Sequence, residues 1–231
     1  MALADNAHQG IIPVPAALGN GDDPERNLYW GAAFGVRTFF RKSAEWHETF
    51  IFEKPYKTVL ARSVFAHRMQ NVILIADAYQ GREIKRALKD FLSAAAGQRL
   101  HAGEPATCMI GGVVWCSPED ADIVAYVGHD GLMDFSLEEV ISGQGDAKRS
   151  AIVLACASKQ YFASVLRPTG AQPLLWTTNL MAPEAYTLKA ALDAWIAGES
   201  DEQIRQRAAA AYAQYQKIST KAALGLFSKG W

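Results

Sequence analysis

The chain has 231 residues, of which 50% are hydrophobic and 20% are charged, and its formal net charge at pH 7 is −1. This length suffices for one α/β domain with a substantial core, and a charge near zero gives no reason to expect binding to nucleic acid or to an anionic membrane. No apolar run approaches the roughly 20 residues that cross a bilayer, and the opening MALADNAHQG lacks the basic and apolar regions of a signal peptide. We expect a soluble protein with no membrane association. It would be cytoplasmic or, if a leader has been removed, periplasmic or secreted.

The first third of the chain is predicted to hold one strand and one helix. Residues 10–18 (GIIPVPAAL) form an apolar run that we expect to be the first strand or an extended entry segment, although its two prolines cannot donate to a sheet. The turn-rich GNGDDPERN follows and has helix-start chemistry. Residues 28–42 are then predicted to form a largely buried helix, and residues 44–71 resemble an insertion with strand-like FIF in it.

The middle of the chain gives clearer signals. Residues 72–76 (VILIA) are typical of a buried strand, and residues 81–96 place their apolar side chains on one face of a helix. Asp77 follows the strand, and we interpret it as a loop cap rather than a catalytic group.

Two apolar runs, residues 123–127 and 151–155, are each followed closely by a residue that can act in catalysis. The first is followed by His129 in a Gly-His-Asp-Gly turn, and the second by Cys156. Runs of Val and Ile without polar alternation are typical of strands buried on both faces of a parallel sheet. The connection contains the helix-like SLEEVIS (136–142) and is long enough for a crossover. We therefore expect the imidazole and the thiol at one carboxyl edge, where open α/β sheets carry their sites.

The last third is predicted to add a strand at residues 172–178, which ends at Asn179, and helices at 183–197 and 200–217. The tail from residue 222 to 231 is expected to pack on the body. The fold class is thus α/β, a single domain over residues 1–231 with a mainly parallel sheet flanked by helices.

The pair VGHDG and IVLAC resembles the signature of the caspase-like cysteine peptidases, the clan of legumains, caspases, metacaspases, gingipains and separases. In that clan an apolar strand ends in His-Gly and a later one ends in Ala-Cys or a close variant. The resemblance covers roughly residues 10–185 and is strongest at 121–179, where WTTN also resembles the legumain pattern. Asp130 departs from the pattern, because it stands between the histidine and the glycine.

The resemblance implies a caspase-like fold and a cysteine endopeptidase with a His129–Cys156 dyad. His129 would protonate the leaving amine, and backbone N–H groups of Asp130, Gly131 and Cys156 would hold the oxyanion. The partner would be a peptide or protein substrate. The sequence names no third member of a triad and leaves the oligomeric state open.

The resemblance also implies substrate-binding positions, namely Arg26 after Gly19-Asn20-Gly21, Leu154 two residues before the cysteine, and Asn179. Pro24 stands where legumains have an asparagine that helps to orient the histidine. Leu154 cannot pair with a charged substrate side chain, so charge selection would come from the loops. Arg26 would favour an acidic or amide side chain and is our preferred candidate. Asp130, Asp134, Asn179 and Glu184 are the alternatives, of which Asp134 or Glu184 would favour a basic one.

The sequence contains neither a CxxC nor an HExxH motif, so we expect no metal site and no cofactor. Cys108 and Cys116 flank MIGGVVW, where Gly111-Gly112 suits a hairpin turn. A bridge between these two cysteines and two separate thiols are both open.

Three other classes of protein are less consistent with the sequence than an active cysteine peptidase. A catalytically inactive caspase-like module that binds a protein or peptide is the main alternative. A flavodoxin- or Rossmann-like ligand binder is disfavoured because no GxGxxG follows a strand, and a serine hydrolase because no GxSxG occurs.

Overall fold

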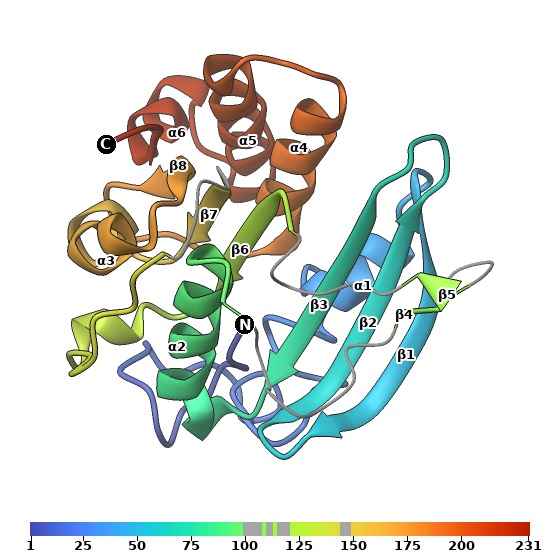
Figure 1. Cartoon of the computed structure of the whole chain (residues 1–231), viewed down its shortest axis with the longest axis vertical. Helices are drawn as coiled ribbons and strands as arrows, with labels where there is room; N and C mark the ends of the chain where they lie inside the picture. The colour runs from blue at the N-terminus through green and yellow to red at the C-terminus, as the bar shows by residue number, and fades with distance from the viewer. Residues whose placement is uncertain (99–107, 110–112, 115–120, 144–148) are drawn as a thin grey trace.

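The structure is a computed structural model that describes residues 1–98, 108–109, 113–114, 121–143 and 149–231. Its described strands are β1 (Trp46–Tyr56), β2 (Val59–His67), β3 (Ile73–Tyr79), β4 (Cys108–Met109), β5 (Val113–Val114), β6 (Ile123–Val127), β7 (Ser150–Leu154), β8 (Gln172–Thr177) and β9 (Phe227–Ser228). The described α-helices are α1 (Val36–Arg41), α2 (Ile84–Ala95), α3 (Ser158–Leu166), α4 (Ala185–Ile196), α5 (Asp201–Gln216) and α6 (Thr220–Leu226). Short 3-10 turns are η1 (Gly81–Glu83), η3 (Gly131–Met133) and η4 (Arg167–Thr169). Figure 1 shows their arrangement.

The described strands fall into two larger sheets and one small two-stranded sheet, so the chain is mixed α/β. The first sheet has the order β1-β2-β3 and is antiparallel throughout. The second has the order β6-β7-β8-β9, in which β6, β7 and β8 are parallel and β9 is antiparallel. The third consists of β4 and β5. The expectation of a mainly parallel sheet therefore holds for β6–β8 alone.

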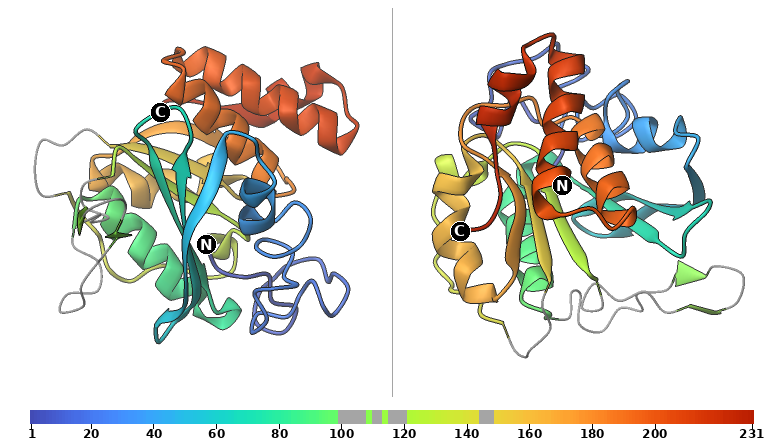
Figure 2. Two further views of the ribbon diagram at one scale, coloured as in Figure 1. Left: turned by 90° about the vertical axis from the view of Figure 1, so that its right-hand side faces the viewer. Right: turned by 90° about the horizontal axis from the view of Figure 1, so that it is seen from above.

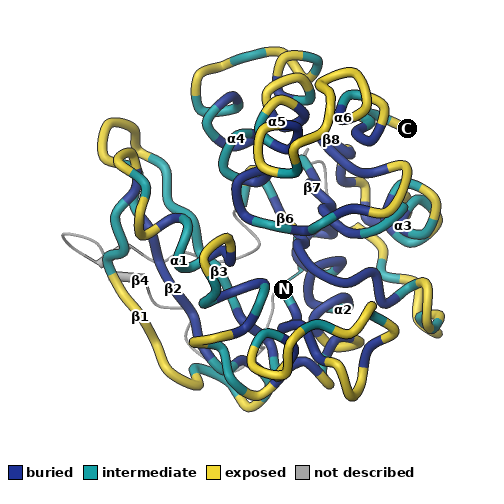
Figure 3. Tube along the Cα trace, turned by 180° about the vertical axis from the view of Figure 1, so that it is seen from behind, coloured by how far each residue is buried: buried dark blue, intermediate teal, exposed yellow. Residues whose placement is uncertain are grey.

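Helices cover both faces of the β6–β9 sheet, because its central strands are apolar on both sides. Val153 and Trp176 belong to a core shared with α2 and α3, whereas Leu154 and Leu175 belong to one shared with α4 and α5. The two further views in Figure 2 show these helices on either side of the strands. By contrast, β1 is an outer strand, and its middle is exposed (Figure 3).

Three predicted elements are absent or shorter than expected. Residues 10–18 contain no strand, since two prolines interrupt the run. The predicted helix at 28–42 is reduced to Val36–Arg41, because residues 28–35 fold back in turns closed by hydrogen bonds such as Val36 N to Tyr29 O (2.8 Å). The predicted helix at 136–142 is wrong, and these residues are irregular.

The apparent insertion at 44–71 is the hairpin of β1 and β2, and the strand predicted at 72–76 is β3, in the antiparallel sheet. The other predicted elements are confirmed with small changes at their ends: the strands at 123–127, 151–155 and 172–178 and the helices at 81–96, 183–197 and 200–217.

The extended segment at the start of the chain is Met1–Ala4 rather than residues 10–18. Ala2 forms a parallel bridge with Tyr79 at the end of β3, and Leu3 N donates to Tyr79 O at 3.0 Å. On its other side, a Cβ atom added to Gly128, just after β6, would lie 3.4 Å from Ala2 O. The segment thus fills the space between the carboxyl ends of β3 and β6.

Candidate functional site

His129 and Cys156 follow two strands that pair side by side. β6 and β7 are parallel with Val127 opposite Leu154, and each candidate residue comes two positions after its strand ends. The predicted placement at neighbouring carboxyl ends is therefore confirmed. Between Val127 and His129, Gly128 has φ +147°, a conformation that residues with a side chain rarely adopt.

Cys156 is a free, partly buried cysteine held by the loop after β8. Its Sγ lies 3.5 Å from Met181 O and 3.4 Å from Met181 N. Burial, followed by the charge of Asp130, raises the pKa of this thiol, although the hydrogen bond with Met181 opposes the rise. The resting thiol is therefore poorly ionised.

The turn that carries the thiol is fixed by hydrogen bonds. Ala157 adopts a left-handed conformation (φ 47°), and its N–H donates to Asn179 O at 2.9 Å. Ser158 then begins α3, and its Oγ donates to Val153 O at 2.8 Å and accepts from Thr177 N at 2.9 Å. These buried contacts tie the turn to β7 and β8.

His129 is bound by an acid that sequence reasoning did not assign to it. Its Nε2 lies 2.6 Å from Oδ2 of Asp134, and its ring is buried. The same oxygen accepts from Gly10 N at 3.0 Å, so the N-terminal loop helps to hold the carboxylate. The signal was the acid five residues after the histidine in GHDGLMD, which was considered only for substrate charge.

No hydrogen bond joins the imidazole of His129 to the thiol of Cys156 among the described residues. The charge that bears on the thiol is that of Asp130. The two predicted partners thus share an edge of the sheet without a hydrogen bond between their side chains among the described residues.

Asp130 caps η3 from a fully buried position. Its Oδ1 accepts from Leu132 N at 3.0 Å, whereas its Oδ2 is buried and has no hydrogen-bond partner in the described part of the chain. Burial, together with the nearby charge of Asp134, raises the pKa of this carboxyl group to about 7, although backbone N–H groups of η3 oppose the rise. Asp130 therefore changes its charge near neutral pH.

The predicted oxyanion donors differ in how they are engaged. Gly131 N donates to His129 O at 3.2 Å, so this N–H is already used. The N–H groups of Asp130 and Cys156 have no hydrogen-bond partner among the residues that the structure describes. Two of the three predicted donors are therefore available.

Two buried tyrosines from other parts of the chain approach the thiol. Tyr29 comes from the N-terminal loop and Tyr212 from α5, and burial and then the charge of Cys156 raise the pKa of both phenols. The Tyr212 hydroxyl accepts from Ala182 N at 3.0 Å, next to Met181. Sequence patterns gave no sign of either residue.

The predicted substrate-binding residues lie in different surroundings. The Arg26 side chain is 70% exposed and its Nε lies 2.7 Å from Asp23 Oδ2, so it faces solvent in the resting structure. Leu154 is fully buried in the core. Asn179 is exposed, and its Oδ1 accepts from Leu180 N at 2.8 Å.

The two remaining acids are engaged elsewhere. Glu184 accepts hydrogen bonds from the Tyr186 hydroxyl at 2.7 Å and from Gln216 Nε2 at 3.1 Å. Asp77 lies within β3 and pairs with Arg62 rather than capping a loop, which corrects its interpretation.

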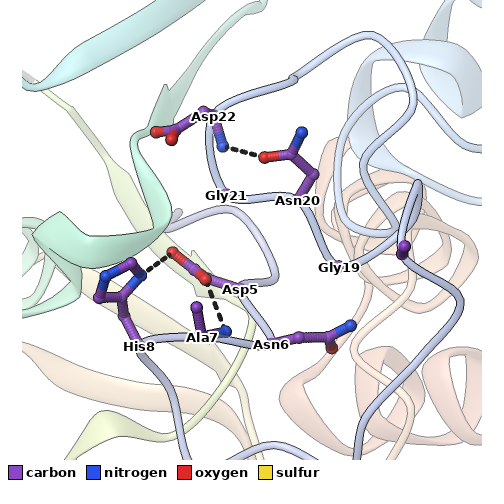
Figure 4. Close-up of a pocket in the computed structure, with 9 residues that line it drawn as sticks. Asp5, Asn6, Ala7, His8, Gly19, Asn20, Gly21 and Asp22 are labelled. Carbon is purple, nitrogen blue, oxygen red and sulfur yellow. Dashed lines mark hydrogen bonds and ion pairs between the residues drawn. The ribbon is translucent and has the colours of Figure 1, made fainter.

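A polar pocket of about 300 Å³ lies between the GNG turn and the residues after the first extended segment (Figure 4). In it, His8 Nδ1 lies 2.9 Å from Asp5 Oδ2, and Asp5 Oδ1 accepts from Ala7 N at 2.9 Å. A side chain on Gly21 would collide with Asp5, which explains the glycine there. The turn predicted to precede a substrate-binding arginine thus packs against the N-terminal segment.

In the described part of the chain, no group of three or more His, Cys, Asp or Glu side chains could hold a metal ion. A search of the described helices for one long and apolar enough to cross a membrane found none. Cys116 and the side chain of Cys108 lie outside the described residues, as does their predicted bridge.

Comparison of the chain with protein-family models, with curated proteins and with solved structures found no match.

Proposed function

We propose that the protein is a cysteine endopeptidase of caspase-like fold, in which Cys156 attacks the peptide carbonyl and His129 carries the proton. The observation that supports it most is the Asp134–His129 pair at the sheet edge shared with Cys156. A nucleophile, a base and an acid that orients the base are the parts that acyl transfer by a thiol needs.

The hydrogen bond to Asp134 determines which ring nitrogen reacts. A carboxylate at Nε2 favours the proton on that nitrogen, which leaves the lone pair of Nδ1 free. His129 Nδ1 then takes the thiol proton while the sulfur adds to the carbonyl carbon. The C–N bond breaks, Nδ1 returns the proton to the amine, and water hydrolyses the thioester by the same route.

The negative oxygen of the tetrahedral intermediate would be held by backbone N–H groups. Those of Asp130 and Cys156 are free among the described residues and sit at the ends of adjacent strands. Because no hydrogen bond joins the imidazole and the thiol in the resting structure, binding of substrate must bring them together. Catalytic hydrogen bonds are often long before substrate binds.

The test is hydrolysis of a fluorogenic peptide library by the wild type, Cys156→Ala and His129→Ala. Both variants should lose at least about 100-fold in kcat/KM. Asp122→Asn is the control, because Asp122 is exposed at the opposite end of β6. Undiminished turnover in either site variant would refute the proposal.

A second candidate is an inactive caspase-like module that binds a protein or peptide. It is favoured by the raised pKa of Cys156 and by the lack of a hydrogen bond between the thiol and His129. A peptidyl chloromethyl ketone distinguishes the two, because a peptidase aligns its thiol with the reagent. Labelling of Cys156 no faster than by iodoacetamide of equal concentration would support the inactive module.

A further inference from the structure

Asp130 is an unusual neighbour for a nucleophilic thiol. Thiolates form readily beside cations, whereas the thiol of Cys156 is disfavoured from ionising by burial and, in addition, by the negative charge of the Asp130 carboxylate. The residue is fully buried at the end of β6, and its Oδ2 finds no hydrogen-bond donor in the described part of the chain. A buried acceptor without a partner costs about 1–3 kcal/mol of stability, so the ionised carboxylate weakens the fold at this position.

The surroundings of the pair are acidic and phenolic. The negative charge of Asp134, on the C-terminal side of η3, helps to raise the pKa of Asp130. The charge of Asp130 in turn adds to the effect of burial in raising the pKa of Tyr126 on β6. Besides burial, the charge of Cys156 raises the pKa of Tyr29 from the N-terminal loop and of Tyr212 from α5. The charge of Glu184, which precedes α4, raises the pKa of both phenols as well. The imidazole of His129 is held by Asp134, and the Tyr126 hydroxyl donates to His129 O at 2.8 Å rather than to Asp130.

We propose that Asp130 is a positioning residue that acts together with burial to keep Cys156 in its resting thiol form, so that the thiolate forms more readily when the Asp130 carboxylate is neutralised. A proton or a substrate N–H placed on the free Oδ2 would do this. The link to catalysis rests on the proposed peptidase function. The effect of Asp130 on the thiol does not, because it can be measured without turnover.

The geometry at η3 supplies a conservative test. Asp130→Asn retains an oxygen for Leu132 N and removes the charge, and Asp130→Ser also retains a capping oxygen. The rate of iodoacetamide reaction at Cys156 is followed by mass spectrometry from pH 6 to 11. The midpoint reports ionisation of the thiol, and the plateau at high pH reports its accessibility.

Both variants should lower the midpoint by about half to one pH unit, a roughly three- to tenfold higher rate at pH 8, with an unchanged plateau. Asp122→Asn, the same change at the other end of β6, should leave the midpoint in place. Circular dichroism verifies that each variant is folded. A midpoint that is unchanged or higher in either folded variant would overturn the proposal, whether or not the protein cleaves peptides.

Discussion

The imidazole of His129 and the carboxylate of Asp134 are joined by a 2.6 Å contact between Nε2 and Oδ2 across a five-residue turn. Gly10 N donates to the same carboxylate oxygen at 3.0 Å. The N-terminal loop, the end of β6 and η3 are thereby tied to one ring. Asp134 is therefore the group that orients the histidine, a role that sequence analysis assigned to no residue.

Replacing Asp134 with Asn should reduce peptide hydrolysis by about 10³-fold or more in kcat. An amide N–H at Nε2 would favour the proton on Nδ1, the nitrogen that must accept it from the thiol. KM should change little, because Asp134 need not touch the substrate. Steady-state kinetics measure both constants, with Asp122→Asn as the control. A loss confined to KM would instead place Asp134 in substrate binding.

Removing the Asp77 side chain should destabilise the first sheet. Arg62 donates to both oxygens of Asp77, at 2.6 and 2.7 Å, and its guanidinium lies 4.9 Å from the centre of the Tyr56 ring. Asp77→Ala leaves a largely buried cation without its counter-charge, which costs about 3–5 kcal/mol of unfolding free energy.

The matched experiment is the double variant Arg62→Leu/Asp77→Leu, which removes both charges together. It should unfold at a higher urea concentration than Asp77→Ala, because an apolar pair leaves no isolated charge. Equal losses in the two proteins would show that the ion pair does not explain the effect.

The elements that the sequence predicted well are those whose signal is local. The strands 123–127 and 151–155 are continuous apolar runs, and the helix at 81–96 has one apolar face, so each pattern leaves few alternatives. The helix predicted at 136–142 is wrong, although Leu137 and Ile141 pack on the core and Glu139 pairs with Lys89 of α2, so these contacts form without helical structure. The helix predicted at 28–42 is shorter than expected because residues 28–35 form turns closed by other hydrogen bonds, such as the one from Val36 N to Tyr29 O.

The site was predictable in part for the same reason. Parallel pairing of β6 and β7 follows from their composition, and it brings His129 and Cys156 to one edge. The contacts of Cys156 with Met181, and the approach of Tyr29 and Tyr212, depend on how distant segments pack. No spacing in the sequence encodes them.

Asp130 should make the protein less stable as pH rises through neutrality. Its pKa of about 7 in the folded protein exceeds the ordinary 3.8, so between these values the folded state binds more protons than the unfolded one. Stability from this group is therefore fully present below about pH 4 and is lost as the pH approaches 7. Urea unfolding at pH 5 and pH 8 should show that Asp130→Asn gains about 1–4 kcal/mol relative to the wild type at the higher pH. An equal difference at both values would contradict the shift.

The last prediction concerns specificity. Arg26 is 70% exposed and bound to Asp23, so it is free to turn towards a substrate at the cost of one exposed ion pair, which is worth no more than about 1 kcal/mol. We predict that fluorogenic peptides with an acidic or amide side chain before the cleaved bond are preferred, and that Arg26→Ala lowers this preference about tenfold. Asp23→Ala, which releases the guanidinium, should keep or strengthen it. Arg41→Ala, another exposed arginine, is the control and should leave it unchanged. Strong cleavage after Arg or Lys that Arg26→Ala does not alter would instead assign the choice of charge to an acidic residue at the site.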